Sequence, residues 1–163
     1  MLTLIGGALL FTAMAYIGIT VKNLYKQRLE LLKYIDDFAV FAEREITLYK
    51  TPVNIIIAKF KILKGEDREQ LLNRYIALTD KSYLSIYGLT NTLYLRKADR
   101  QLISDFLLNL GKGNYAEEIK YIESFIKDIG NLREEAANLL RVEGRLYSRL
   151  LMLVGIALMI IVV

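Results

Sequence analysis

The amino-acid sequence predicts an all-α protein, an antiparallel helical bundle flanked by N- and C-terminal membrane helices. Three observations predict this fold class. Apolar residues recur at spacings of three and four through the middle of the chain, as they do on one face of a helix. Proline occurs only once, at Pro52, so little interrupts the helical pattern. All 22 Lys and Arg and all 18 Asp and Glu lie between Lys22 and Arg149, which leaves both ends of the 163-residue chain uncharged.

The predicted N-terminal transmembrane anchor occupies residues 1–21 and contains 20 uncharged residues from Leu2 to Val21. At about 1.5 Å per residue, a helix of that length reaches roughly 30 Å, the thickness of the hydrocarbon core. The Ala13-Met14-Ala15 segment resembles a signal-peptide cleavage site. However, no basic region precedes it and the apolar run continues beyond it, so an uncleaved anchor is favoured.

The predicted C-terminal hydrophobic membrane segment, residues 150–163, has 14 uncharged residues and forms roughly 21 Å of helix. This is shorter than a full span, so the sequence leaves open whether the segment crosses the bilayer. Basic residues flank both apolar ends on their inner sides, and the positive-inside rule therefore places the central domain, 22–149, in the cytoplasm. The membrane-flanking basic residues are Lys22, Lys26, Arg28, Arg141, Arg145 and Arg149.

The central domain is predicted to be helical throughout. The first helix continues from the membrane to about Tyr49, and Thr51-Pro52 starts the next, because proline suits the first turn of a helix. Lys64-Gly65 ends that helix, Gly88 interrupts the stretch 79–92, and a long helix from about Asn114 runs to the C-terminus. The predicted inward residues are Leu24, Leu31, Ile35, Phe38, Ala42, Ile46, Val53, Ile56, Ile57, Phe60, Leu71, Leu72, Tyr75, Ile76, Leu102, Ile103, Phe106, Leu110, Ile119, Ile122, Ile126, Ile129, Ala136 and Leu140.

The composition argues against catalysis. Cysteine and histidine are absent, which removes disulfides, thiolate and imidazole metal ligands and catalysis by either side chain. Adjacent acids on a helix point about 100° apart, so Asp36-Asp37, Glu117-Glu118 and Glu134-Glu135 are predicted to form solvated faces. The net charge of +4 is mild and interleaved, which disfavours nucleic-acid binding. The protein is therefore predicted not to be an enzyme and to bind neither cofactor nor metal.

Tyrosine is unusually abundant, with 11 copies and no tryptophan. Its ring combines apolar area with a polar hydroxyl, which suits protein interfaces. Two interpretations remain open from the sequence, an adhesive protein-binding surface or half-buried helix positions. The tyrosines concerned are Tyr49, Tyr75, Tyr83, Tyr87, Tyr94, Tyr115 and Tyr121.

Three short segments follow one another in a recognisable order. They are Glu43-Arg44-Glu45-Ile46 followed by Thr51-Pro52, the stretch from Leu93 that ends Asn109-Leu110-Gly111, and the tail from Leu150 through Gly155. Together they resemble the stage III sporulation protein AB family over nearly the whole chain. Departures from the family pattern occur at Leu48, at Lys112-Gly113-Asn114, at Glu118-Ile119 and at Leu151.

The resemblance implies a sporulation protein in the channel complex that links mother cell and forespore, located in the mother-cell membrane around the forespore. The family's helical domain is similar to cytoplasmic domains of secretion and pilus platform proteins. By that analogy it would dock the cognate stage III sporulation AA ATPase, a cytoplasmic protein, together with other channel subunits. The interaction candidates are Glu43, Glu45, Ile46, Tyr49, Thr51, Pro52, Leu110 and Gly111.

Two alternatives stay open beside this reading. Thr51-Pro52 can simply start a helix while Glu45 pairs locally, without any partner. The whole protein can instead be a membrane-anchored protein that binds anionic lipids in an unrelated role, since basic residues flank both apolar ends and membrane lipids are partners in either case.

Overall fold

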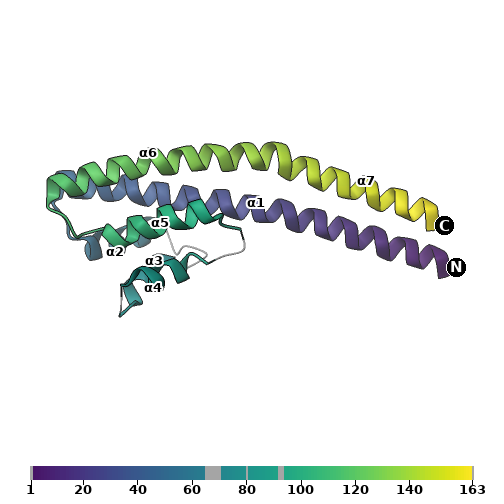
Figure 1. The fold of residues 1–163 in the computed structure, drawn as a ribbon, viewed down its shortest axis with the longest axis horizontal. Helices are drawn as coiled ribbons and strands as arrows, with labels where there is room; N and C mark the ends of the chain where they lie inside the picture. Colours follow the sequence, from purple (N-terminus) through teal and green to yellow (C-terminus); the bar gives the residue numbers. More distant parts are fainter. Residues whose placement is uncertain (1, 65–70, 80, 92–93, 163) are drawn as a thin grey trace. The chain divides into compact units, whose positions relative to one another are not determined.

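The structure, a computed structural model, describes residues 2–64, 71–79, 81–91 and 94–162. Its regular structure over these residues consists of helices and no strand (Figure 1). The helices are α1 (Leu2–Tyr49), α2 (Val53–Lys64), α3 (Leu71–Ala77), α4 (Tyr83–Leu89), α5 (Lys97–Asn109), α6 (Tyr115–Leu139), the π-helical turn η1 (Leu140–Gly144) and α7 (Arg145–Val162). The predicted all-α class is confirmed.

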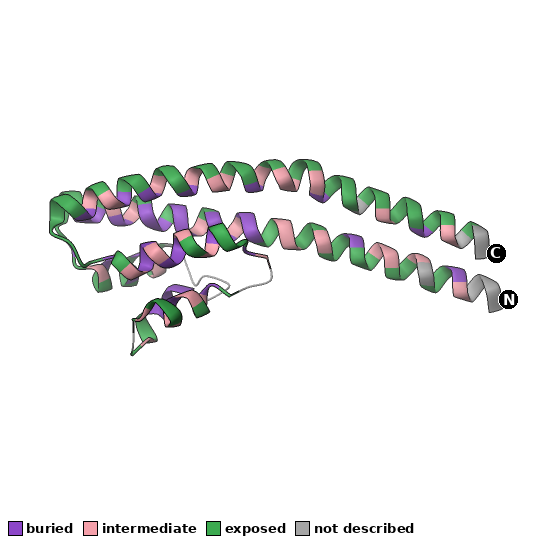
Figure 2. Cartoon of the chain, in the orientation of Figure 1, coloured by how far each residue is buried: buried purple, intermediate pink, exposed green. Residues whose placement is uncertain are grey.

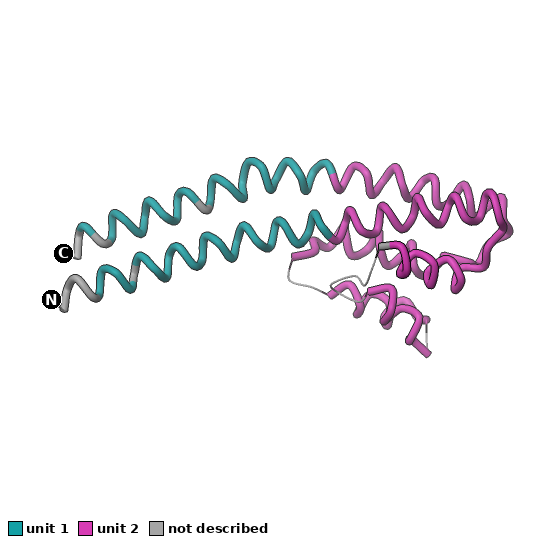
Figure 3. The backbone as a smooth tube through the Cα atoms, turned by 180° about the vertical axis from the view of Figure 1, so that it is seen from behind, with its two compact units in different colours: residues 1–30, 134–163 teal, residues 31–133 magenta. Residues whose placement is uncertain are grey.

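The chain divides into two compact units (Figure 3). Unit 1 comprises residues 1–30 and 134–163, and unit 2 comprises residues 31–133. The predicted domain limits after residues 21 and 149 concern the edge of a membrane, and they stay predictions.

The core of unit 2 is aromatic. Phe38 of α1 lies 5.3 Å from Phe60 of α2 and 6.3 Å from Phe106 of α5, measured between ring centroids in edge-to-face pairs. Phe106 also stacks on Phe125 of α6 at 3.8 Å. Four helices therefore meet at one cluster of rings, and Figure 2 shows the buried positions concentrated in this unit.

Within unit 2, α6 runs antiparallel to the last turns of α1, as predicted. At one end, the Tyr115 hydroxyl donates to the carbonyl of Lys50 at 3.4 Å. At the other end, Arg133 forms an ion pair with Asp36. Because low residue numbers on one helix meet high numbers on the other, these contacts set the direction of the pair.

Most predicted inward positions are buried, with informative exceptions. Ile76 was predicted to point inward, but 43% of its surface is exposed. Gly88 lies inside α4 and does not interrupt a helix, so that prediction is wrong. Helix α2 ends at Lys64 as predicted, and Gly65 lies outside the described residues.

Unit 1 is a pair of helices that approach each other at glycines. A Cβ atom on Gly155 of α7 would lie 3.2 Å from Met14 and Phe11 of α1. A Cβ on Gly144 would lie 3.6 Å from the Tyr25 ring, and the Tyr25 hydroxyl donates to Glu143 at 3.0 Å. The absence of a side chain at these two glycines allows the close packing.

One helix in the described part of the chain, Gly6–Tyr49 within α1, is long and apolar enough by length and composition to cross a membrane. The structure does not describe the side chains of residues 159 and 161–163, at the end of the C-terminal segment. Its predicted membrane insertion therefore stays a prediction.

Candidate docking site

The first predicted contact segment surrounds the end of α1. Lys50 adopts a left-handed backbone with φ 50°, and its N–H donates to the carbonyl of Ile46 at 3.0 Å. Together with the N–H of Thr51, which donates to the carbonyl of Glu45 at 3.4 Å, this bond satisfies free carbonyl groups at the end of α1. The chain then reverses, and Pro52 leads into α2, with its carbonyl accepting from the N–H groups of Ile55 and Ile56.

The Glu45 carboxylate ties this turn to α2. It accepts a hydrogen bond from the Thr51 hydroxyl at 2.9 Å and pairs with the Lys59 ammonium at 2.6 Å. The hydrogen bond from Lys59, reinforced by Thr51, holds the pKa of Glu45 below its ordinary value. Local pairing of Glu45, one of the two alternatives left open by the sequence, is therefore present, and a contact of Glu45 with a partner stays a prediction.

The second predicted segment is a tight loop between α5 and α6. Gly111 has φ +81°, and a Cβ there would lie 2.9 Å from Val53 of α2, so only glycine fits without strain. Its N–H donates to Glu118 at 2.6 Å, and the N–H of Gly113 donates to the same carboxylate at 3.3 Å.

Glu118 corrects a sequence prediction. It was expected on a solvated face beside Glu117, but it is 5% exposed and serves as the acceptor for the loop. Glu117 is exposed, as expected. The sequence did not predict this role. The backbone N–H groups that require an acceptor face Glu118 only because of the backbone conformation at Gly111 and Gly113.

The two segments meet at one pocket of about 370 Å³. Five of the eight interaction candidates line it, namely Ile46, Thr51, Pro52, Leu110 and Gly111. The remaining lining residues are Val53, Asn54, Tyr75, Lys81, Gly113, Tyr115 and Glu118. We call this the motif pocket.

Two of the predicted adhesive tyrosines belong to the motif pocket. Tyr75 is buried, with the Lys81 ammonium 4.6 Å from its ring centre, and burial raises the pKa of its phenol. Tyr115 is 53% exposed and lies beneath the Lys50 ammonium at 5.8 Å. The tyrosine set is therefore mixed, with one ring in the floor and one at the rim. Lys81 was not singled out by any sequence pattern.

The other candidates lie elsewhere. Tyr49 is exposed at the end of α1, with the Lys59 ammonium 5.7 Å from its ring. Glu43 lines a separate groove of about 760 Å³ between α1 and α2.

That groove also contains Asp36, which corrects a second prediction. Asp36 was expected on a solvated face, but it is buried and paired with Arg133. Burial raises the pKa of its carboxyl, although the positive charge of Arg133 acts in the opposite direction.

A family model described as stage III sporulation protein AB matches residues 3–163. The chain belongs to the stage III sporulation protein AB family. Its role in sporulation follows from that membership. Neither a curated protein nor a solved structure matches the chain.

The departures of this stage III sporulation protein AB chain from the family pattern have different structural consequences. Leu48 is 63% exposed and lines the α1–α2 groove outside the motif pocket. Gly113 and Glu118, in contrast, hydrogen-bond to each other in the loop beside that pocket. The departures at Lys112-Gly113-Asn114 and at Glu118-Ile119 are thus joined by a hydrogen bond of their own.

The predicted membrane-flanking residues of this stage III sporulation protein AB chain all belong to unit 1. Arg28 differs from the rest because it is 3% exposed and lies 3.8 Å from Glu135. Lys22, Lys26, Arg141, Arg145 and Arg149 are exposed. Among the described residues, no group of three or more acidic side chains could hold a metal ion.

Proposed function

We propose that this sporulation protein is a membrane-anchored adaptor of the mother cell–forespore channel complex. Its helical domain docks the cognate stage III sporulation AA ATPase, and channel subunits, through the motif pocket and its rim. The anchors hold it in the mother-cell membrane around the forespore, with residues 22–149 in the cytoplasm.

The meeting of the two motif segments at one pocket is the observation that supports this proposal. Ile46 and Gly111 are far apart in the sequence, yet both line the same concave surface. Residues that contribute only to the ends of their own helices are not expected to line one shared pocket.

The motif pocket is preorganised for binding. Glu45 fixes the turn before α2, and Glu118 fixes the loop before α6, each through two contacts. A partner that docks there loses little free energy to the ordering of these segments. Asn54 and Tyr115 are exposed at the pocket and are available for direct contact.

Substitution at the pocket rim tests the proposal. In Asn54→Arg, a long charged side chain replaces an exposed polar one, and it is expected to block docking without disturbing the core. We expect the full-length protein in detergent to lose at least about ten-fold in affinity for the purified ATPase, about 1.4 kcal/mol. Affinity capture with quantified binding measures the loss.

Asn131→Arg is the matched control, because Asn131 is an exposed helix position in unit 2 that does not line the motif pocket. It is expected to bind the ATPase like the unmodified protein. Equal binding by both variants, or no binding by the unmodified protein, would contradict the proposed docking function.

A further inference from the structure

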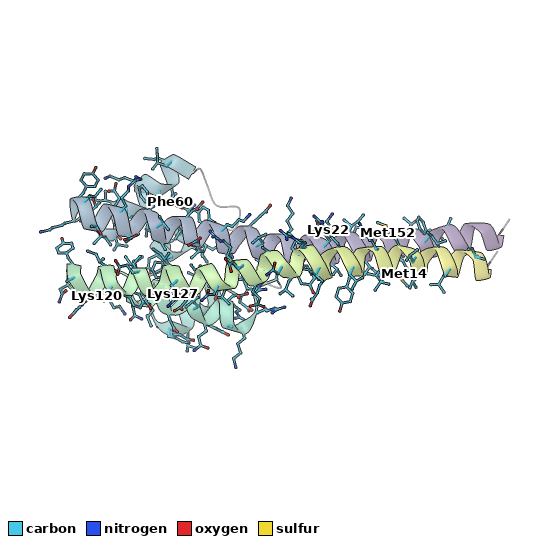
Figure 4. The ribbon with its side chains drawn as sticks, turned by 90° about the horizontal axis from the view of Figure 1, so that it is seen from above. Met14, Lys22, Phe60, Lys120, Lys127 and Met152 are labelled. Carbon is cyan, nitrogen blue, oxygen red and sulfur yellow. The ribbon has the colours of Figure 1, made fainter. Side chains whose placement is uncertain are left out.

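A group of exposed cations lies where the helix pair of unit 1 becomes apolar. It consists of Lys22 on α1, Arg141 in η1 and Arg145 and Arg149 on α7, which we call the basic collar. Figure 4 shows Lys22 at the boundary where charged side chains give way to apolar ones, with Met14 and Met152 beyond it.

The contacts of unit 1 bring three collar residues, Lys22, Arg145 and Arg149, to nearly the same level. Tyr25 packs against Gly144, so antiparallel helices place Lys22, three residues earlier, opposite the position three residues after Gly144. That position lies between Arg145 and Arg149. Lys22 is thus about 4.5 Å along the axis from the Tyr25 contact and shares its level with these two arginines.

The three arginines form a stripe. Four residues of an α-helix turn about 40° past one full revolution, so residues at this spacing drift slowly around the axis. The wider i→i+5 turn of η1 advances less per residue and offsets this drift between Arg141 and Arg145. The stripe extends over about 12 Å along the helix, enough to cover a headgroup layer of roughly 5–8 Å.

Unit 1 carries six Lys or Arg against four Glu, so positive charge remains in excess. Glu30 pairs with Lys26 at 3.5 Å and Glu135 lies 3.8 Å from Arg28, while Glu143 accepts a hydrogen bond from the Tyr25 hydroxyl at 3.0 Å. None of the four collar residues forms an ion pair with another residue that the structure describes. Four cations therefore remain available to an external anion.

The surface next to the collar indicates which anion fits. Ile19 on α1 and Leu150 and Leu153 on α7 are about half exposed or more. A free phosphate would use only the cations, whereas a phospholipid presents its phosphate to the collar and its acyl chains to these apolar side chains. We infer that the basic collar is a binding site for anionic phospholipid headgroups. This inference rests on the membrane location in the proposed function, but not on ATPase docking.

Native mass spectrometry of the full-length protein released from mixed micelles tests the inference. The micelles contain equal amounts of phosphatidylglycerol and phosphatidylethanolamine with identical acyl chains. We expect the unmodified protein to retain phosphatidylglycerol preferentially. Each basic residue near an anionic surface contributes about five-fold, so Lys22→Gln/Arg145→Gln/Arg149→Gln is expected to lower the preference at least about ten-fold.

The matched control is Lys97→Gln/Lys112→Gln/Lys120→Gln, which removes the same charge from exposed positions of unit 2. Its lipid preference is expected to equal that of the unmodified protein, with the same helical circular dichroism in all three proteins. Equal losses in both variants, no preference in the unmodified protein, or displacement of the lipid by millimolar inorganic phosphate would each overturn the inference. The collar variant is also tested for capture of the ATPase. Loss of lipid preference with normal ATPase capture shows that lipid binding and docking are separate.

Discussion

Unit 2 is stabilised by packed aromatic rings and buried polar contacts. The two helices of unit 1 instead approach each other closely at glycines, where no side chain separates them. In unit 2, Phe38, Phe60 and Phe106 fill the centre and are almost fully buried. In unit 1, Gly144 and Gly155 mark the closest approaches, and they expel little apolar surface from water.

The outward faces differ in the same sense. Unit 1 exposes large apolar side chains along its ends, including Leu9, Ile17, Leu153 and Ile160. Such a surface is unfavourable in water and favourable in hydrocarbon, where packing of small residues replaces the hydrophobic effect as the main attraction between helices. The difference teaches that the same helical fold class can be stabilised in two ways, and three pairs of substitutions test it.

The largest effect is expected from removal of an aromatic ring in unit 2. Phe38→Ala leaves a cavity against Phe60 and Phe106 and is expected to lower the free energy of unfolding by about 3–5 kcal/mol. Tyr16→Ala removes a ring that is 72% exposed in unit 1 and is expected to change it by less than about 0.5 kcal/mol. Denaturant titration of the full chain in detergent, followed by circular dichroism, measures both. Similar losses in the free energy of unfolding for both variants would show that aromatic packing is not specific to unit 2.

A smaller effect is expected at the glycine of the motif pocket. Gly111→Ala combines a left-handed backbone with a 2.9 Å approach to Val53 and is expected to cost about 2–3 kcal/mol of stability. Gly130→Ala is the control, because no atom lies within 4 Å of its added Cβ in α6. It is expected to stabilise by roughly 0.5–1 kcal/mol. If the same titration found that Gly111→Ala leaves the free energy of unfolding unchanged, the close approach to Val53 could not explain why glycine occupies this position.

The sequence predicts the faces of the helices to within about one residue, and packing decides the rest. Ile126 was placed on the inward stripe of α6, but its neighbour Phe125 is the buried residue, because Phe106 stacks against it. Adjacent helix positions point about 100° apart. The heptad spacing therefore predicts which face of α6 is buried, but it does not decide whether Phe125 or Ile126 is the buried residue.

The site was less predictable than the fold. The two motif segments could be named from their order in the chain, but their convergence depends on the loop at Gly111 and on the turn at Lys50. Lys50 has a positive φ although it is not glycine, and sequence pattern carries no signal for that conformation. The buried role of Glu118 follows from the same loop, so no spacing rule could reveal it.

The smallest effect concerns pH and contrasts two carboxylates of unit 2, Glu45 and Asp36, whose pKa values shift in opposite directions. Lys59 lowers the pKa of Glu45, so this group stabilises the fold at neutral pH and loses that contribution as the pH falls through its lowered pKa. Burial raises the pKa of Asp36, so the fold favours its protonated form, and stability falls as the pH rises through the raised pKa. The free energy of unfolding, measured between about pH 3 and pH 7, distinguishes them. The stability advantage of the unmodified protein over Glu45→Gln is expected to shrink toward acid. Because Asn resembles the protonated carboxyl, Asp36→Asn is expected to gain stability relative to the unmodified protein as the pH rises, whereas parallel curves would show that neither pKa is shifted.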